Sequence, residues 1–443
     1  MNSRLNFKPQ TAVILSLLLA FLLAIGGPGC TKSKKSADID DPANAASQPV
    51  ALPEDDPEAA AKLEEAGFAI TKNDQGRVVS VSVNRTNDLT EAAQWIAKLP
   101  ALESAKLSGS GIKDGAIQAL EGLTRLTRLD LESAGVTNAC LKSVGKITSL
   151  QVLILRLTSI TDEAFVDLEQ LQKLRMLDLR NSNVTDAAMP AISKLSSLVD
   201  LQLERAKVSA AGLQHLQGLK LKSINLNTTS VKDETLKILG QIPTLEQLQL
   251  DETSITDDGM VHVAKLKSLK RLRMRGCFIT GAGLEHLRNS KSIERLELRG
   301  VPINDVGLDV ISGFPKLNYL DVSECKVITN DGIAKLGQLN ELQTLGFWET
   351  KLDDAGLAAL AGLRKLEDLD VRSTKISNNS AKVIAGFANL KRLNLEGTRL
   401  NDEAASNLVN CKSLTWINVA NTGFSYDGVD QLTAANPELE VVE

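Results

Sequence analysis

Arginine and large aromatic side chains gather in one stretch of the sequence and offer its clearest chemistry. The set comprises Arg271, Arg273, Arg275, Arg295, Arg299, Tyr319 and Trp348. The first three alternate with apolar residues, and the next two recur 24 residues later, so their side chains should share one surface. Guanidinium groups bind carboxylates and other oxyanions with paired hydrogen bonds, and arginine and aromatic residues dominate interface hot spots. The pattern predicts a binding site for an acidic protein segment or an anionic glycan.

An alternative interpretation is a solvated strand face whose charges offset one another. Asp251, Glu297 and Asp321 lie close enough in the pattern to neutralise much of the arginine charge. If the binding hypothesis is right, reversing Arg273 and Arg275 to glutamate should abolish partner capture while leaving the fold intact. Both interpretations stay open at the level of sequence.

Other candidate sites are weaker. The only histidines, His215, His262 and His286, occupy the same helical position of their repeats, and a metal site would need further ligands nearby. Recurring aspartates raise the possibility of calcium, but each sits at an expected helix start, where the helix dipole explains it. These are Asp114, Asp162, Asp186, Asp233, Asp257, Asp305, Asp354 and Asp402. We therefore expect no metal and no cofactor.

Motifs of catalysis are not found either. The sequence contains no nucleophile elbow, no phosphate-binding glycine loop and no zinc-binding histidine pair. Evenly spaced repeats also leave no inserted loop to house an active site. We expect no catalytic residues and no enzyme activity.

The elements that position these side chains recur with a period of 24 residues, best seen at 243–266. Leucines alternate in the first part of the unit, which favours a short strand with one buried face. Apolar residues three or four apart follow, which favours one or two turns of helix. Thr256 should cap that helix by accepting a backbone N–H. Stacked units of this kind bury their apolar rows and form a curved solenoid.

Repeats fill most of the chain and set its domain boundaries. About 15 units run over residues 76–436, and residues 437–443 should add a closing strand. Residues 56–75 predict a short amphipathic capping helix that includes Leu63, Ala66 and Ile70. A cap is needed because the first repeat would otherwise expose its core. Trp416 and Phe424 are expected to seal the last repeat.

The units LTSITDEAFVDLEQL (157–171) and ETKLDDAGLAALAGL (349–363) resemble leucine-rich repeats. Threonine, serine, alanine or cysteine replaces the usual buried asparagine, as in the cysteine-containing repeats of F-box proteins and in secreted leucine-rich-repeat lipoproteins of planctomycete bacteria. GFAITKNDQGRVVSVSVN near the start is similar to the latter group, and no F-box precedes the repeats. The resemblance implies an α/β fold: a right-handed horseshoe with a parallel β-sheet on the concave face and short helices on the convex face. For function it implies protein or ligand binding.

The first 55 residues predict export and anchoring. Residues 1–30 combine two basic residues with an apolar run and small residues, as in a secretory leader. Cys30 ends it in an arrangement that resembles a bacterial lipoprotein signal, which implies lipidation of Cys30. Residues 31–55 lack large apolar side chains and should form a disordered tether. We expect a protein secreted across the cytoplasmic membrane and lipid-anchored to a bacterial membrane, facing the periplasm or the exterior.

Composition narrows the possible partners. A formal net charge of −5 gives no support for nucleic-acid binding. Cys140, Cys277, Cys325 and Cys411 should be small buried residues rather than disulfide partners. Val152, Ile154 and Met176 should form a small exposed apolar patch on the concave face.

Two functions remain at this stage. The first is a noncatalytic, monomeric binding module that binds a protein or glycan on its concave face. The alternative is a structural protein of the cell envelope that self-associates through its sides. Apolar residues on the helical side would favour the alternative, and that side carries mostly Lys, Glu, Gln and Ala.

Overall fold

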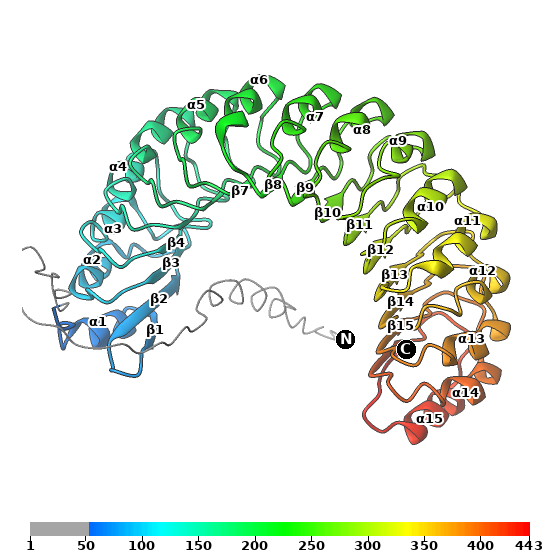
Figure 1. Cartoon of the computed structure of the whole chain (residues 1–443). Coiled ribbons are helices and arrows are strands. Elements are labelled where there is room, and N and C mark those ends of the chain that lie inside the picture. The colour runs from blue at the N-terminus through cyan, green and yellow to red at the C-terminus, as the bar shows by residue number, and fades with distance from the viewer. Residues whose placement is uncertain (1–52) are drawn as a thin grey trace, which may run out of the picture. The chain divides into compact units, whose positions relative to one another are not determined.

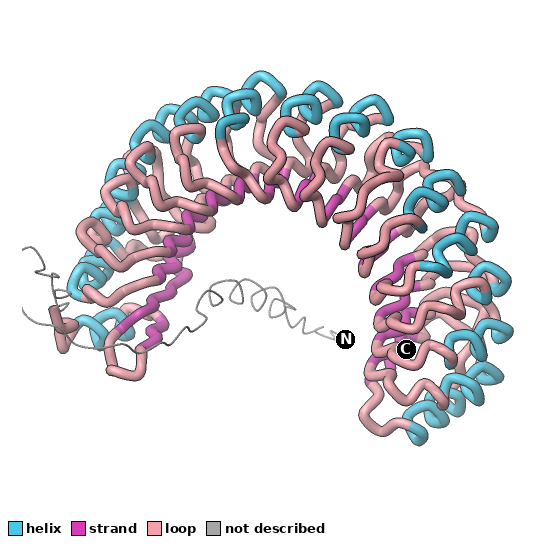
Figure 2. The backbone as a smooth tube through the Cα atoms, in the orientation of Figure 1, coloured by secondary structure: helices cyan, strands magenta, loops and turns pink. Residues whose placement is uncertain are grey.

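The computed structural model describes residues 53–443, which form one curved body. A sheet of 17 strands lines the inner side of the curve, and short helices cover its outer side (Figures 1 and 2). The predicted right-handed solenoid, open and built from mostly parallel strands, is confirmed. The leader at 1–30, Cys30 and the tether up to residue 52 lie outside the described residues. No helix within 53–443 is long and apolar enough to cross a membrane.

Most strands are only three residues long. In chain order they are β1 (Ala69–Lys72), β2 (Val78–Asn84), β3 (Ser104–Ser108), β4 (Arg128–Asp130), β5 (Val152–Ile154), β6 (Met176–Asp178), β7 (Asp200–Gln202), β8 (Ser223–Asn225), β9 (Gln247–Gln249), β10 (Arg271–Arg273), β11 (Arg295–Glu297), β12 (Tyr319–Asp321), β13 (Thr344–Gly346), β14 (Asp368–Asp370), β15 (Arg392–Asn394), β16 (Trp416–Asn418) and β17 (Glu440–Val442). From β2 onward each strand pairs in parallel with the next, whereas β1 pairs antiparallel with β2.

The outer side combines α-helices with 3₁₀ turns. The α-helices are α1 (Ala59–Glu65), α2 (Thr90–Ala93), α3 (Asp114–Gln118), α4 (Cys140–Val144), α5 (Met189–Ile192), α6 (Ala210–Leu213), α7 (Asp233–Leu239), α8 (Asp257–Val263), α9 (Gly281–Glu285), α10 (Asp305–Ser312), α11 (Asn330–Lys335), α12 (Asp354–Ala358), α13 (Ala381–Ala385), α14 (Asp402–Leu408) and α15 (Tyr426–Ala435). The 3₁₀ turns are η1 (Gln94–Lys98), η2 (Asp162–Leu168), η3 (Asp186–Ala188), η4 (Gln214–Gly218), η5 (Leu336–Gln338) and η6 (Asn378–Ser380).

Leucine layers hold the stack together. Leu272 on β10 is fully buried and lies in register between Leu248 on β9 and Leu296 on β11. Burying one such side chain contributes about 1.5–3 kcal/mol. Because a lone repeat would leave these leucines exposed, each repeat depends on its neighbours.

Small residues replace asparagine inside most turns, as the sequence indicated, and several of them are polar. The buried Thr253 hydroxyl donates to the Leu250 carbonyl at 2.6 Å, and the Cys325 thiol donates to Leu298 at 3.2 Å. All four cysteines within residues 53–443 are buried and free, which confirms the prediction for them. Burial raises the pKa of Cys325 to about 12, so this thiol stays protonated and unreactive.

Aspartates tie eight helix starts to the next repeat. The Asp257 carboxylate accepts hydrogen bonds from the Thr280 backbone N–H at 2.7 Å and from its hydroxyl at 2.6 Å. The same pair of bonds to a Ser or Thr of the next repeat is made by Asp114, Asp162, Asp186, Asp233, Asp257, Asp305, Asp354 and Asp402. We call this set the aspartate ladder. The helix dipole alone was therefore an incomplete explanation of these residues.

Thr256 shows the same arrangement and corrects one expectation. Its hydroxyl makes no cap to its own helix, and instead donates to Asp233 at 2.7 Å. Glycine three residues later leaves room for that aspartate, because a Cβ on Gly259 would stand 2.4 Å from Asp233 Oδ1. The recurring D-x-G spacing thus reflects packing between repeats.

The N-terminal end is closed by more than a helix. Helix α1 buries Ala59 and Leu63 against the first repeat. The expectation that Ile70 lies in this helix is wrong, because Ile70 lies on β1 and pairs with Val81 of β2. An added antiparallel strand satisfies the backbone groups that the edge of β2 would otherwise present.

Candidate binding surface

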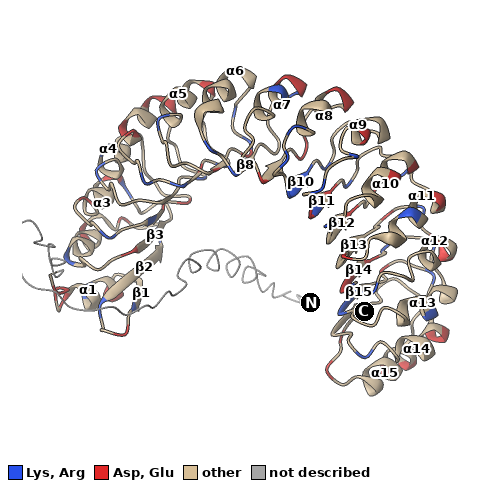
Figure 3. Ribbon diagram, viewed as in Figure 1, with Lys and Arg blue, Asp and Glu red and all other residues tan. Residues whose placement is uncertain are grey.

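Each short strand presents three outward positions to the concave face, at its first and third residues and two residues further on. On β10 these are Arg271, Arg273 and Arg275, while Leu272 and Met274 between them are fully buried. The parallel register places Arg271 beside Arg295 of β11. The basic residues of β10 and β11 thus stand side by side on the inner wall (Figure 3). We call Arg271, Arg273, Arg275, Arg295 and Arg299 the arginine surface.

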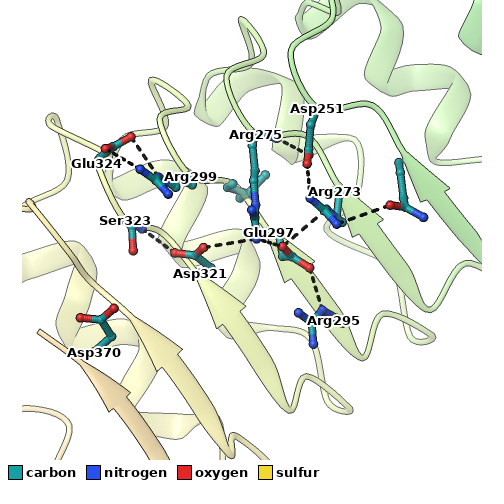
Figure 4. A network of polar contacts seen from close by, with 12 residues as sticks. Asp251, Arg273, Arg275, Arg295, Glu297, Arg299, Asp321, Ser323, Glu324 and Asp370 are labelled. Atoms are coloured by element: carbon teal, nitrogen blue, oxygen red, sulfur yellow. Dashed lines mark hydrogen bonds and ion pairs between the residues drawn. The ribbon is translucent and has the colours of Figure 1, made fainter. Parts of the chain in front are cut away.

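Glu297 lies beneath these arginines and is 1% exposed. Its carboxylate accepts a hydrogen bond from Arg295 Nε at 2.7 Å, lies 3.5 Å from Arg273 Nε and pairs with Arg275 (Figure 4). Burial acts to raise the pKa of Glu297, but the Arg295 hydrogen bond and the charges of the other two arginines outweigh it and lower the pKa. Glu297 is therefore ionised at neutral pH and fixes three guanidinium groups.

The other two acids of the alternative interpretation also meet the arginines. Asp251 pairs with Arg273 and accepts a backbone hydrogen bond from Arg275 at 3.0 Å. Asp321 lies 4.0 Å from Arg275. These distances support the sequence-based view that the acids offset the arginine charge. The same ion pairs mean that Arg273 and Arg275 help to stabilise the concave face.

Aromatic rings fix the remaining side chains. The Arg295 guanidinium lies over Tyr319 at 3.5 Å from the ring centroid, and Arg299 lies over Trp348 at 4.2 Å. Arg299 also bonds the Glu324 carboxylate at 3.0 Å. Tyr319 and Trp348 are consequently in contact with the arginine surface, as their positions in the repeat indicated.

Arg271 differs from its neighbours. It is exposed and makes no ion pair with any of residues 53–443. The five arginines of this surface meet four carboxylates, Asp251, Glu297, Asp321 and Glu324, which leaves a surplus of one positive charge. Much of the charge is neutralised, but the surface remains basic and its arginines are held in place.

Sequence reasoning missed an apolar stripe along one edge of the same repeats. Phe278, Pro302 and Val327 occupy equivalent positions just after β10, β11 and β12, and all three are exposed, Phe278 to 64%. We call them the edge stripe. The signal was present in the sequence, because most other repeats have a polar residue or glycine at this position.

Other predicted positions turn out differently. The exposed apolar patch is wrong in part: Ile154 is buried, and Val152 and Met176 are half-buried. Trp416 does not seal the core but lies on the concave face, with Arg392 over its ring at 4.2 Å. The histidines are spread over the outer helical side, His215 and His286 exposed and His262 half-buried. Among residues 53–443 no group of acids, histidines and cysteines is arranged to hold a metal ion.

Comparison with known proteins supports the fold assignment. A family model described as "Leucine Rich repeat" matches residues 315–337, and no curated protein sequence matches the chain. An internalin from Listeria monocytogenes is 18% identical and aligns over 87% of this chain and 93% of its own with a TM-score of 0.52. A leucine-rich-repeat protein from Leptospira interrogans is 20% identical, aligns over 82% and 100%, and has a TM-score of 0.55. These likenesses show that the chain has the leucine-rich-repeat fold.

Proposed function

We propose that this leucine-rich-repeat protein is a noncatalytic binding module that holds an acidic segment of a partner protein on its arginine surface. The observation that carries the proposal is the basic surplus on β10 and β11, displayed by side chains that Glu297 and Tyr319 already fix in place. Fixed side chains lose little rotamer entropy when a ligand binds. Arg271, which has no ion pair within residues 53–443, is the first contact for an incoming carboxylate.

A protein segment fits this surface better than a glycan. The aromatic faces of Tyr319 and Trp348 already carry guanidinium groups, so stacking against a sugar ring would have to displace them. Carboxylates of a peptide need only the exposed edges of the guanidinium forks. An anionic glycan remains the second kind of ligand whose negatively charged groups could bind the arginines.

The test compares the wild type with Arg271→Glu and with Lys106→Glu. Lys106 is an exposed cation on β3, on the same concave face but outside the arginine surface. Binding is measured by surface plasmon resonance to a glutamate-rich peptide and to heparin. We expect Arg271→Glu to bind the peptide about tenfold more weakly, since reversing one charge alters the pair energy by about 1.4 kcal/mol. Lys106→Glu should bind as the wild type does.

Equal loss in the two variants would mean that only overall charge matters, and the proposed site would be rejected. Stronger loss for heparin than for the peptide would replace the acidic protein segment with a glycan. Circular dichroism should show unchanged folding for both variants, because neither residue is buried or ion-paired with the described residues.

A second candidate function is self-association, and the edge stripe favours it. Exposed Phe278, Pro302 and Val327 give one lateral side an apolar strip. Stable dimers bury about 1,200–2,000 Å² in total, far more than three side chains supply. This route predicts weak, concentration-dependent dimers that Phe278→Ser abolishes, measured by light scattering after size-exclusion chromatography. A monomer at all concentrations would leave binding as the sole function.

We further propose that the module acts outside the cytoplasm, tethered by lipid on Cys30. Support comes from the leader-like residues 1–30 and the polar residues 31–55. Mass spectrometry of the exported wild-type protein should find an acylated N-terminal cysteine. Cys30→Ser should appear in the soluble fraction with unchanged binding of the peptide.

A further inference from the structure

Gly346 leaves a gap in an otherwise filled row of side chains. It is the third residue of β13 and lies in register between Asp321 and Asp370. Every other parallel strand carries a side chain at the equivalent outward position. The backbone at Gly346 does not have a positive φ, so its conformation does not require glycine.

Space around Gly346 does not demand glycine either. A Cβ there would lie 2.9 Å from Asp321 Oδ1 and 3.2 Å from Ser323 Oγ, and both contacts are with side-chain atoms that can shift. The missing side chain instead opens a hollow of about 240 Å³ on the concave face. Its walls include Tyr319, Trp348, Asp321, Ser323, Asp368 and Asp370. We call this the Gly346 hollow.

Two oxygen-bearing groups in the hollow lack hydrogen bonds from the protein. Ser323 is 4% exposed, yet its hydroxyl makes no hydrogen bond with any of residues 53–443, and its oxygen faces the space where the Gly346 side chain would stand. The Asp368 carboxylate likewise accepts no hydrogen bond from these residues, and its nearest cation, Arg392 Nε, is 3.7 Å away. Burial, which outweighs the charge of Arg392, raises the pKa of Asp368.

The neighbouring charges leave the hollow acidic. Arg372, one of its lining cations, is bonded to Asp370, and the other, Arg299, is bonded to Glu324. Asp321 and Asp368 have only longer ion pairs, with Arg275 at 4.0 Å and Arg392 at 3.7 Å. A bound cation would find two carboxylates and one hydroxyl acceptor within a half-buried site, where charge pairs are stronger than in water.

We propose that the Gly346 hollow takes one lysine or arginine side chain of the partner protein. The hollow is smaller than the roughly 300–1,000 Å³ of small-molecule sites, which suits one long side chain. Asp321 and Asp368 can meet the positive charge at the end of that side chain. The proposal rests on the proposed binding function and adds a second contact: an acidic residue on the arginine surface and a basic one two or three strands away.

The experiment uses N-acetyl-lysine methylamide, N-acetyl-arginine methylamide and, as an uncharged match, N-acetyl-norleucine methylamide. Saturation-transfer NMR and titration measure their binding to the wild type, Gly346→Asn and Ser82→Asn. Asparagine occupies the Gly346 row at Asn394 and Asn418, so the fold accommodates it. Ser82→Asn adds the same side chain to that row on β2, far from the hollow.

We expect the two charged probes to bind the wild type and Ser82→Asn alike, and at least about tenfold more weakly to Gly346→Asn. Asp368→Asn should also weaken them, and the norleucine probe should not bind. The proposal is overturned if no charged probe binds, if Gly346→Asn binds as well as the wild type, if norleucine competes equally, or if only a neutral sugar such as glucose binds.

The glutamate-rich peptide separates this inference from the proposed function. Gly346→Asn should bind that peptide normally, and Arg271→Glu should bind the lysine probe normally. Loss of the peptide by Gly346→Asn would mean that the whole wall had been disturbed, and the hollow would then have no independent role. If Arg271→Glu binds the glutamate-rich peptide as well as the wild type does, and the lysine probe still binds the wild type, only the arginine surface is rejected.

Discussion

Carboxylates link neighbouring repeats in two regions of the molecule, the aspartate ladder at the helix starts and the arginine surface on the inner wall. In the ladder, one aspartate meets one Ser or Thr of the next repeat, and the pair recurs along the chain. On the arginine surface, Glu297 alone holds three guanidinium groups from two strands. The ladder is periodic, whereas the arginine surface occurs once.

The difference separates framework from site. An interaction that recurs in many repeats can be explained by stacking alone, because each unit has the same need to fix its neighbour. An interaction that one repeat makes needs another explanation. The Gly346 hollow, like the arginine surface, is a departure from the period, and both lie on β10 to β14. The functional proposals therefore rest on positions where the repeat is broken.

The largest expected effect on stability tests whether the residues of the proposed site also belong to the framework. Arg273→Glu with Arg275→Glu would place new carboxylates beside buried Glu297 and Asp251. Breaking buried charge pairs costs about 3 kcal/mol or more, so we expect a clear fall in the free energy of unfolding, measured with urea. The earlier expectation that this variant keeps its fold is thus revised.

Arg271→Glu supplies the matched control for that variant, because it reverses a charge on the same strand without touching Glu297. Its stability should stay within about 0.5 kcal/mol of the wild type. If the double variant were as stable as Arg271→Glu, the pairs around Glu297 would carry no framework role.

The next effect concerns the ladder. Asp257→Ala removes two hydrogen bonds to Thr280 from a charged acceptor, which should cost about 1.5–3 kcal/mol. Asp258→Ala, at the adjacent exposed position, should change stability by about 0.5 kcal/mol or less. Both are near the start of α8, so an equal loss in the two would show that the helix dipole, and not the link between repeats, explains the aspartates.

Prediction from sequence succeeded where the period was strong. Leucines at alternate positions led to the strands and the outward direction of Arg271, Arg273 and Arg275, and the resemblance to leucine-rich repeats led to the concave and convex faces. The same reasoning failed for Ile154. Alternation predicts which way a side chain points, but not how far its neighbours on the curved inner face bury it. Sequence reasoning also placed Ile70 in a helix, since the first strand lies outside the period.

The site could be predicted only in part. Residue types identified the arginines and the acids that offset them, but not that Glu297 would be buried beneath three of them. Gly346 was visible in the sequence as a glycine where the other parallel strands carry a side chain, but only its neighbours in the structure show that it opens a hollow. Phe278 was visible in the sequence as an apolar residue at a polar position, and a comparison of that position across repeats would have found it.

Acid titration gives an effect about as large as that of Asp257→Ala and sharpens the account of Glu297. Because its folded-state pKa is lowered, the ionised carboxylate stabilises the fold above its unfolded pKa of about 4.3. That contribution is lost as the pH falls through the lower folded pKa. Glu297→Gln should therefore be about 1.5–3 kcal/mol less stable than the wild type at pH 7, and this difference in the free energy of unfolding should narrow below pH ~4. A gap that is constant with pH, measured by urea unfolding, would contradict the ionised assignment.

The smallest expected effect concerns Gly346 and separates a binding role from a packing role. Glycine within a strand costs stability relative to alanine by about 0.5–1 kcal/mol, and no backbone strain at Gly346 offsets that cost. Gly346→Ala should therefore leave the free energy of unfolding unchanged or slightly raise it, once Asp321 and Ser323 have shifted by a few tenths of an ångström. A loss above about 2 kcal/mol would mean that glycine is needed for packing. A stable Gly346→Ala protein with weakened lysine-probe binding would instead show that the fold tolerates a side chain where the ligand does not.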